Sequence, residues 1–153
     1  MFRLNRLTDY AVVVMSQMAL RSGETRSAQQ ISEDTGVPLP TVSKLLNLLG
    51  HAKLVTSQRG AAGGYTLSAE PEDISVAQII QALEGPIALT ACVDGATDSC
   101  DSESFCPMRG NWNKVNGAIR EALTSVNLAD MMAFPPAFDV PPRDPPQRAA
   151  AKQ

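Results

Sequence analysis

The feature that most constrains the fold of this chain is a pair of short helix-forming segments separated by a turn. Ser27 and Gln30 have the spacing of a capping box, in which two side chains satisfy free N–H groups at a helix start. Gly36 is suited to end this helix, and Pro40 is suited to open a second one that we expect to run through Leu49. Two short helices joined by a glycine-containing turn predict a helix-turn-helix.

The second segment has one apolar and one polar face. Its leucines and valine recur at helical spacing and form a stripe that we expect to be buried. The opposite face carries Thr41, Ser43, Lys44 and Asn47. Hydroxyl, amide and ammonium groups can bond to base edges and phosphates, so residues 40–49 are predicted to be a recognition helix in the major groove of DNA.

A glycine-rich hairpin is predicted after this helix. Residues 54–57 and 65–67 favour strands, and the segment between them contains Arg59, Gly60, Gly63 and Gly64. The glycines allow positive φ and close backbone approach, while Arg59 can enter a minor groove or meet a phosphate. The segment lacks the Gly-Lys-Ser/Thr ending of a nucleotide-binding loop. We therefore predict a DNA-binding wing that includes these four residues.

Two further helices are expected to support this unit. Apolar residues repeat at helical spacing over residues 8–22 and predict a core helix. Ser75 and Gln78 form a second capping-box pattern, and Gly85 ends the helix that follows. The predicted fold is mainly α, with a winged helix-turn-helix DNA-binding domain at residues 1–86 that has a small β-hairpin wing.

Charge is distributed unevenly along the 153 residues, whose net charge is −3. Residues 1–70 contain 7 Lys and Arg against 5 Asp and Glu, whereas residues 71–153 contain 6 against 11. The first part is therefore the one expected to face DNA. The chain contains no run of about 18 apolar residues, the length that would predict a membrane helix. The N-terminus has no recognisable secretory signal, so we expect a cytoplasmic protein without a membrane partner.

Three cysteines, Cys92, Cys100 and Cys106, gather in a polar loop predicted at residues 87–106. An odd number cannot pair fully into disulfides, and a cytoplasmic location favours free thiols. Their spacing does not match the paired knuckles of structural zinc sites, whereas a loop can wrap such thiolates around an iron-sulfur cluster. Zinc, another metal, a metal-free redox switch and incidental clustering remain alternatives. A cluster also needs a fourth ligand, which the cysteines do not supply.

A long C-terminal dimerisation helix is predicted at residues 107–131. Pro107 is suited to its first position, with Cys106 as the N-cap. Apolar residues recur there at alternating steps of four and three, which is typical of a helix that pairs with a second copy. The predicted dimer contacts are Met108, Trp112, Val115, Ile119, Ala122 and Val126. Residues 132–153 are rich in proline and are expected to form a disordered tail.

The arrangement resembles the Rrf2 winged-helix transcriptional regulators, which include iron-sulfur biogenesis regulators and nitric-oxide-sensing repressors. The resemblance rests on residues 7–11, 57–65 and 92–112, and within the family it is greatest to regulators of the SUF iron-sulfur assembly genes. It implies a [2Fe-2S] or [4Fe-4S] cluster, a homodimer, promoter DNA as the partner, and repression of SUF-type genes.

The resemblance also bears on the fourth ligand. Biogenesis regulators of the family have a histidine where this chain has Arg109, which cannot bind a metal because it stays protonated. Resemblance to the nitric-oxide sensors implies a different fourth ligand, an aspartate donated by the partner subunit. Asp9 matches its position. As an alternative, Asp9 stabilises the start of its helix. Local carboxylates are further candidates, namely Asp94, Asp98, Asp101 and Glu103.

The sequence is compatible with other functions to different degrees. A nitric-oxide or redox-sensing repressor of the same family differs only in its signal. A zinc or iron-sulfur module for interaction or electron transfer would have no use for a recognition helix and a wing. An enzyme is not expected, because the single histidine, His51, lies far along the chain from the cysteines and no catalytic set of side chains is recognisable.

Overall fold

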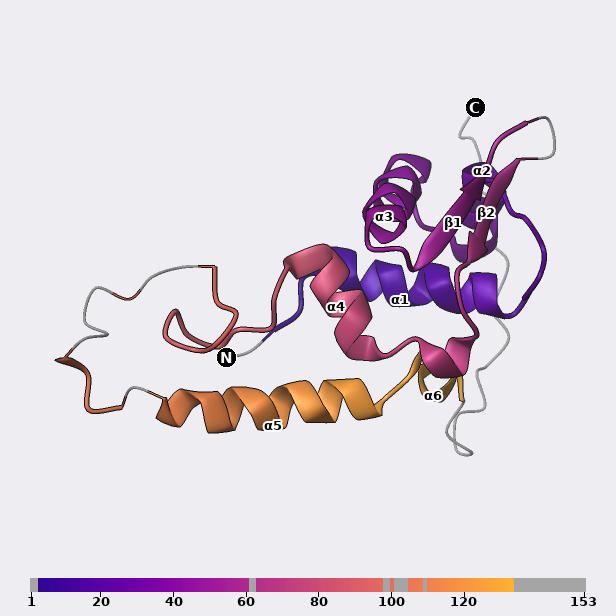
Figure 1. Cartoon of the computed structure of the whole chain (residues 1–153). Coiled ribbons are helices and arrows are strands. Elements are labelled where there is room, and N and C mark those ends of the chain that lie inside the picture. Colours follow the sequence, from indigo (N-terminus) through magenta and orange to yellow (C-terminus); the bar gives the residue numbers. More distant parts are fainter. Residues whose placement is uncertain (1–2, 61–62, 98–99, 101–104, 109, 134–153) are drawn as a thin grey trace, which may run out of the picture.

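The computed structural model describes residues 3–60, 63–97, 100, 105–108 and 110–133. The elements, drawn in Figure 1, are α1 (Arg6–Ala19), α2 (Ala28–Thr35), α3 (Leu39–His51), β1 (Val55–Gln58), β2 (Gly64–Leu67), the short 3-10 helix η1 (Pro71–Asp73), α4 (Val76–Glu84), α5 (Asn111–Ser125) and α6 (Leu128–Met132). The fold is mainly helical with one two-stranded antiparallel hairpin, which confirms the predicted fold class.

The helix-turn-helix forms as its local signals predict. Ser27 and Gln30 make both hydrogen bonds of the capping box at the start of α2, and Gly36 ends that helix in the left-handed region with φ of 71°. Helix α3 begins one residue before Pro40. Helix α1 is shifted toward the N-terminus relative to the predicted residues 8–22, because the side chain of Asn5 accepts from the Thr8 N–H and caps the helix there.

The wing pairs β1 with β2 in antiparallel register, with Val55 opposite Leu67 and Ser57 opposite Tyr65. The other edge of β2 also has a partner. The N–H of Arg26 donates to the carbonyl of Tyr65 at 3.0 Å, and the N–H of Tyr65 donates to the carbonyl of Arg26 at 2.8 Å. The segment that leads into α2 is therefore bonded directly to the wing.

The main core lies beneath the helix-turn-helix and is centred on α1. Its fully buried side chains come from every surrounding helix. They include Val14 and Met15 of α1, Ile31 of α2, Leu45, Leu46 and Leu49 of α3, Ile79 of α4 and Leu128 of α6. Each such side chain contributes roughly 1.5–3 kcal/mol by leaving water. The core therefore holds the polar face of α3 outward.

The prediction of one continuous helix at residues 107–131 is wrong. Helix α5 starts only at Asn111, after Gly110 adopts φ of 80°, so neither Pro107 nor Cys106 begins a helix. At the other end, the carbonyl of Val126 accepts from the Val76 N–H at 2.9 Å instead of continuing the helix. Asn127 then caps α6 with its own capping box.

This break divides the predicted dimer contacts. Met108 precedes α5 and does not share its helical register. Ile119 and Val126 are half-buried and pack against a small cluster around α4, which contains Val76, Ala77, Ile80 and Ile87. Trp112, Val115 and Ala122 are exposed. In Figure 1, α5 extends beyond the helix-turn-helix body, on the side opposite the wing.

Several predicted features lie outside the described residues. They are Asp98, Asp101, Glu103, Arg109 and the tail from residue 134 onward. None of the helices in the described part of the chain has both the length and the apolar character needed to cross a membrane.

Candidate functional site

The polar face of α3 is presented to solvent. Ser43, Lys44 and Asn47 are exposed, and Thr41 is half-buried. Lys44 forms no ion pair with any described residue. An ammonium group that is free of carboxylates on a helix surface is available to a phosphate or a base.

The wing supplies Arg59 and a set of structurally required glycines. Arg59 is exposed at the tip of β1. A Cβ on Gly63 would lie 2.5 Å from the carbonyl oxygen of Gln58, and one on Gly64 would lie 2.5 Å from that of Arg26. Gly60 has open space but φ of 118°, which favours glycine. The structure thus gives the glycines a role in shaping the wing, and their predicted contact with DNA stays a prediction.

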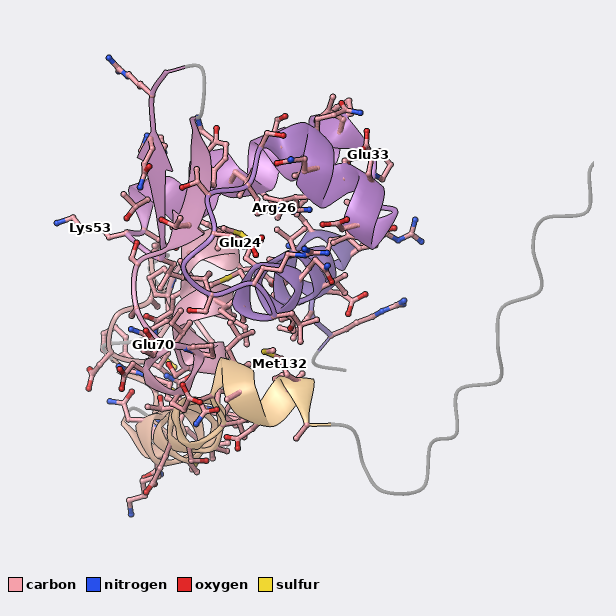
Figure 2. The ribbon with its side chains drawn as sticks, turned by 90° about the vertical axis from the view of Figure 1, so that its right-hand side faces the viewer. Glu24, Arg26, Glu33, Lys53, Glu70 and Met132 are labelled. Carbon is pink, nitrogen blue, oxygen red and sulfur yellow. The ribbon has the colours of Figure 1, made fainter. Side chains whose placement is uncertain are left out.

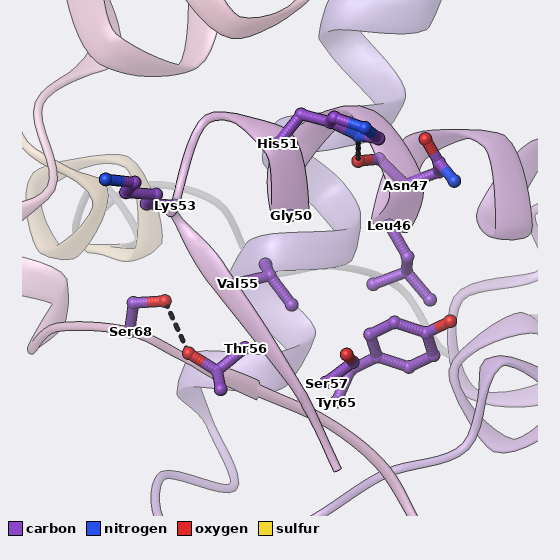
Figure 3. A pocket seen from close by; sticks show the side chains of 10 residues that line it. All are labelled: Leu46, Asn47, Gly50, His51, Lys53, Val55, Thr56, Ser57, Tyr65 and Ser68. Atoms are coloured by element: carbon purple, nitrogen blue, oxygen red, sulfur yellow. Dashed lines mark hydrogen bonds between the residues drawn. The ribbon is translucent and has the colours of Figure 1, made fainter. Parts of the chain in front are cut away.

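A hollow of about 480 Å³ separates α3 from the hairpin (Figure 3). Its lining residues are Leu46, Asn47, Gly50, His51, Lys53, Val55, Thr56, Ser57, Tyr65 and Ser68. No carboxylate lines it, and most of the polar groups can donate hydrogen bonds. Such a surface suits an anion better than a cation.

Two basic side chains of this hollow lie at the end of α3 and just after it. His51 Nδ1 lies 2.8 Å from the carbonyl oxygen of Asn47, so Nδ1 carries the proton and donates to that oxygen. Lys53 has φ of 60°, which is unusual for a residue other than glycine. Figure 2 shows its side chain extending into solvent. Lys53 was not predicted from the sequence, although its position between a helix and a strand was a usable signal.

The cysteine loop follows α4. Cys92, Cys100 and Cys106 are all half-buried and none forms a disulfide. Three free, partly accessible thiols in one loop are the donor chemistry that an iron-sulfur cluster needs, so the residues fit that group. Among the described residues, however, no three potential ligands from histidine, cysteine, aspartate and glutamate gather at one point.

The candidates for a fourth ligand differ in their surroundings. Asp94 is engaged by Asn113, whose amide donates to its Oδ2 at 3.0 Å. Asp9 is exposed in the first turn of α1 and lines a second hollow of about 720 Å³ together with Arg3, Arg6 and Met131. The described residues do not bring Asp9 together with the cysteines of the same chain. Its predicted role as a ligand from the partner subunit remains a prediction.

Comparison with known proteins connects this architecture with transcription. The model of the Rrf2 family, described as iron-dependent transcriptional regulators, matches residues 4–133. The regulator CymR of Bacillus subtilis is 32% identical over 126 residues, which cover 82% of this chain and 86% of CymR. The regulator IscR of Sodalis glossinidius is 30% identical over 139 residues, which cover 90% of this chain and 83% of IscR.

Solved structures that resemble this chain include the same two regulators, CymR and IscR. The structure of CymR (YrzC), the global cysteine regulator of B. subtilis, has a TM-score of 0.67 at 30% identity and covers 86% of this chain and 97% of that one. The structure of T. potens IscR has a TM-score of 0.62 at 34% identity and covers 86% of each chain. The polar recognition helix, the wing and these similarities together show that the chain belongs to the Rrf2 family of DNA-binding transcriptional regulators.

Proposed function

We propose that this protein is a homodimeric repressor of iron-sulfur cluster assembly genes, of the SUF type, and that its DNA affinity reports the state of an iron-sulfur cluster. One observation carries the proposal. The three free cysteines occupy a single loop that connects α4, which packs in the winged helix-turn-helix core, with α5, whose outer face is exposed. A ligand bound by this loop can therefore act on both units.

Binding to DNA would use α3 and the wing together. Helix α3 would enter the major groove with Thr41, Ser43, Lys44 and Asn47, while Arg59 enters the neighbouring minor groove or meets a phosphate. The hollow between these two elements has no carboxylate. It would accommodate the negatively charged backbone that runs between the two grooves.

A second copy of the chain would cover the exposed face of α5. Trp112 and Val115 are 42% and 46% exposed, which is unusual for large apolar side chains that lie on one stripe of a helix. Pairing two copies would set two recognition helices about one helical turn of DNA apart, as in other dimeric helix-turn-helix proteins.

A bound cluster would supply sensitivity to iron, oxidants and nitric oxide. The residues of this chain would hold it with Cys92, Cys100 and Cys106, and Asp9 from the partner subunit is the proposed fourth ligand. Loss of the cluster would remove the link among Cys92, Cys100 and Cys106 and change the separation of the two recognition helices.

A second candidate function follows from the similarity to CymR, which is named as a cysteine regulator. The same fold would then respond to a thiol signal through its cysteines and hold no iron. Its DNA contacts would be unchanged, so the two candidates differ in the content of the loop.

The experiment that separates them is anaerobic purification followed by visible absorption and Mössbauer spectroscopy. The same sample is titrated onto promoter DNA before and after cluster removal. Iron with sulfide, together with DNA retardation that depends on the cluster, is the expected result. Colourless protein that still retards DNA would reject the cluster mechanism and favour the thiol-responsive regulator.

A further inference from the structure

Two asparagines of α5 hold the segment that carries the first cysteine. The amide of Asn116 donates to the carbonyl of Ile87 at 3.0 Å, and its Oδ1 accepts from the Leu89 N–H at 3.1 Å. One turn earlier on the helix, the Oδ1 of Asn113 accepts from the Asp94 N–H at 2.9 Å, and its amide donates to the Asp94 carboxylate. The segment is thus bonded to α5 on both sides of Cys92.

Burial makes these contacts costly to lose. Asn116 is only 3% exposed, and it is the one buried side chain that α5 contributes among the described residues. A buried amide needs partners for both its oxygen and its nitrogen, and the main chain of Ile87 and Leu89 supplies one to each. Val93, next to Cys92, is also buried, at 5% exposure. Both features favour one arrangement of residues 87–94.

Thr90 adds a contact to the sulfur itself. Its Oγ1 lies 3.3 Å from Cys92 Sγ. A cysteine that binds a metal has lost its proton, so in that state the threonine hydroxyl must be the donor. Hydrogen bonds to the sulfurs raise the reduction potential of an iron-sulfur cluster because they stabilise added negative charge.

We infer that Asn113 and Asn116 are positioning residues that fix Cys92 on α5 as a pre-arranged ligand, with Thr90 as a donor to its sulfur. The inference rests on the proposed cluster function and deepens it. Asp94 accepts from the Asn113 amide through Oδ2, which does not prevent a carboxylate from binding a metal, so Asp94 stays among the candidates for the fourth ligand. Because α5 packs on α4 through Ile119 and Leu123, the position of Cys92 is linked to the DNA-binding core.

The first test compares cluster-free full-length wild type with Asn113→Ala and Asn116→Ala. Asn111→Ala is the matched control, because Asn111 lies on the same helix but its amide meets only the sulfur of Met108 among the described residues, at 3.8 Å. Hydrogen exchange of residues 87–94 should be about three- to tenfold faster in Asn113→Ala, which loses the acceptor for the Asp94 N–H. Asn113 is only half-buried, so this variant should fold even if Asn116→Ala does not.

The second test uses the reconstituted protein. Asn113→Ala should release iron several-fold faster than Asn111→Ala and should change the visible circular dichroism of the cluster. Thr90→Val should lower the reduction potential of the cluster, and Thr90→Ser, which keeps the hydroxyl, should restore it.

The outcomes separate this inference from the proposed function. Equal exchange rates and equal iron release in Asn113→Ala and Asn111→Ala would overturn the role of the asparagines, even in a protein that holds a cluster. If wild type takes up no iron, the proposed function fails, while the exchange comparison still decides whether the asparagines hold residues 87–94.

Discussion

At the scale of single residues, Arg59 is the side chain whose proposed role in DNA binding is easiest to isolate. It is exposed and forms no ion pair with any described residue. Arg59→Ala should weaken promoter binding by about 1–3 kcal/mol and reduce the salt dependence by about one counterion, with the cluster retained. Fluorescence anisotropy at several salt concentrations measures both. Arg120→Ala, an exposed change on α5, is the control, and unchanged affinity in Arg59→Ala would remove the wing from the interface.

Cys100 provides a second test at this scale. It is half-buried and forms no disulfide, so Cys100→Ala should leave the fold intact. With one thiolate gone, the loop should no longer retain the cluster, and the visible absorption of the anaerobic protein should disappear. A variant that keeps the wild-type spectrum would contradict the assignment of this residue as a ligand.

At the scale of elements, the end of α4 is bonded to the start of α1. The carboxylate of Glu84 accepts from the Asn5 N–H at 3.1 Å and from the hydroxyl of Thr8, which is buried. A negative charge at this helix start is also favourable. Glu84→Ala should therefore lower the free energy of unfolding by about 1 kcal/mol. Urea denaturation measures this, with the exposed Glu72→Ala as control. Equal stability of the two variants would show that the contact contributes nothing.

Elements with local signals were predicted best. The capping boxes at Ser27 and Ser75 fix α2 and α4 from neighbouring residues alone. The break between α5 and α6 was missed because it depends on a long-range contact, the bond from the Val76 N–H to the carbonyl of Val126. A local signal existed there too, since Asn127 and Asp130 have the spacing of a capping box.

The candidate site was predicted less completely than the fold. The polar face of α3 and the three cysteines were found because residue type and spacing suffice to recognise them. The hollow beside α3 was missed, because Lys53 and Ser68 meet there only after the hairpin folds back on the helix. The bonds from Asn113 and Asn116 likewise join positions separated by 19 to 29 residues, so spacing along the chain could not predict them.

At the scale of the whole molecule, the proposed dimer depends on the exposed face of α5. Val115→Asp would place a charge in that contact and should shift the protein to monomers, with weaker promoter binding because one subunit spans only half a site. Thr124→Asp introduces the same charge on the opposite face of the helix, nine residues away, and is the matched control. Light scattering coupled to size exclusion measures the mass. A Val115→Asp dimer as stable as that of the control would place the interface elsewhere.

The pairing of Arg26 with Tyr65 has a consequence for the length of DNA that one subunit reads. Because the wing is bonded to the segment that opens α2, it cannot swing independently of the helix-turn-helix. The distance between the base pairs that α3 is proposed to read and those that Arg59 is proposed to meet would then be fixed by the protein. We expect an operator with one base pair inserted between these two positions to lose one of the two contacts.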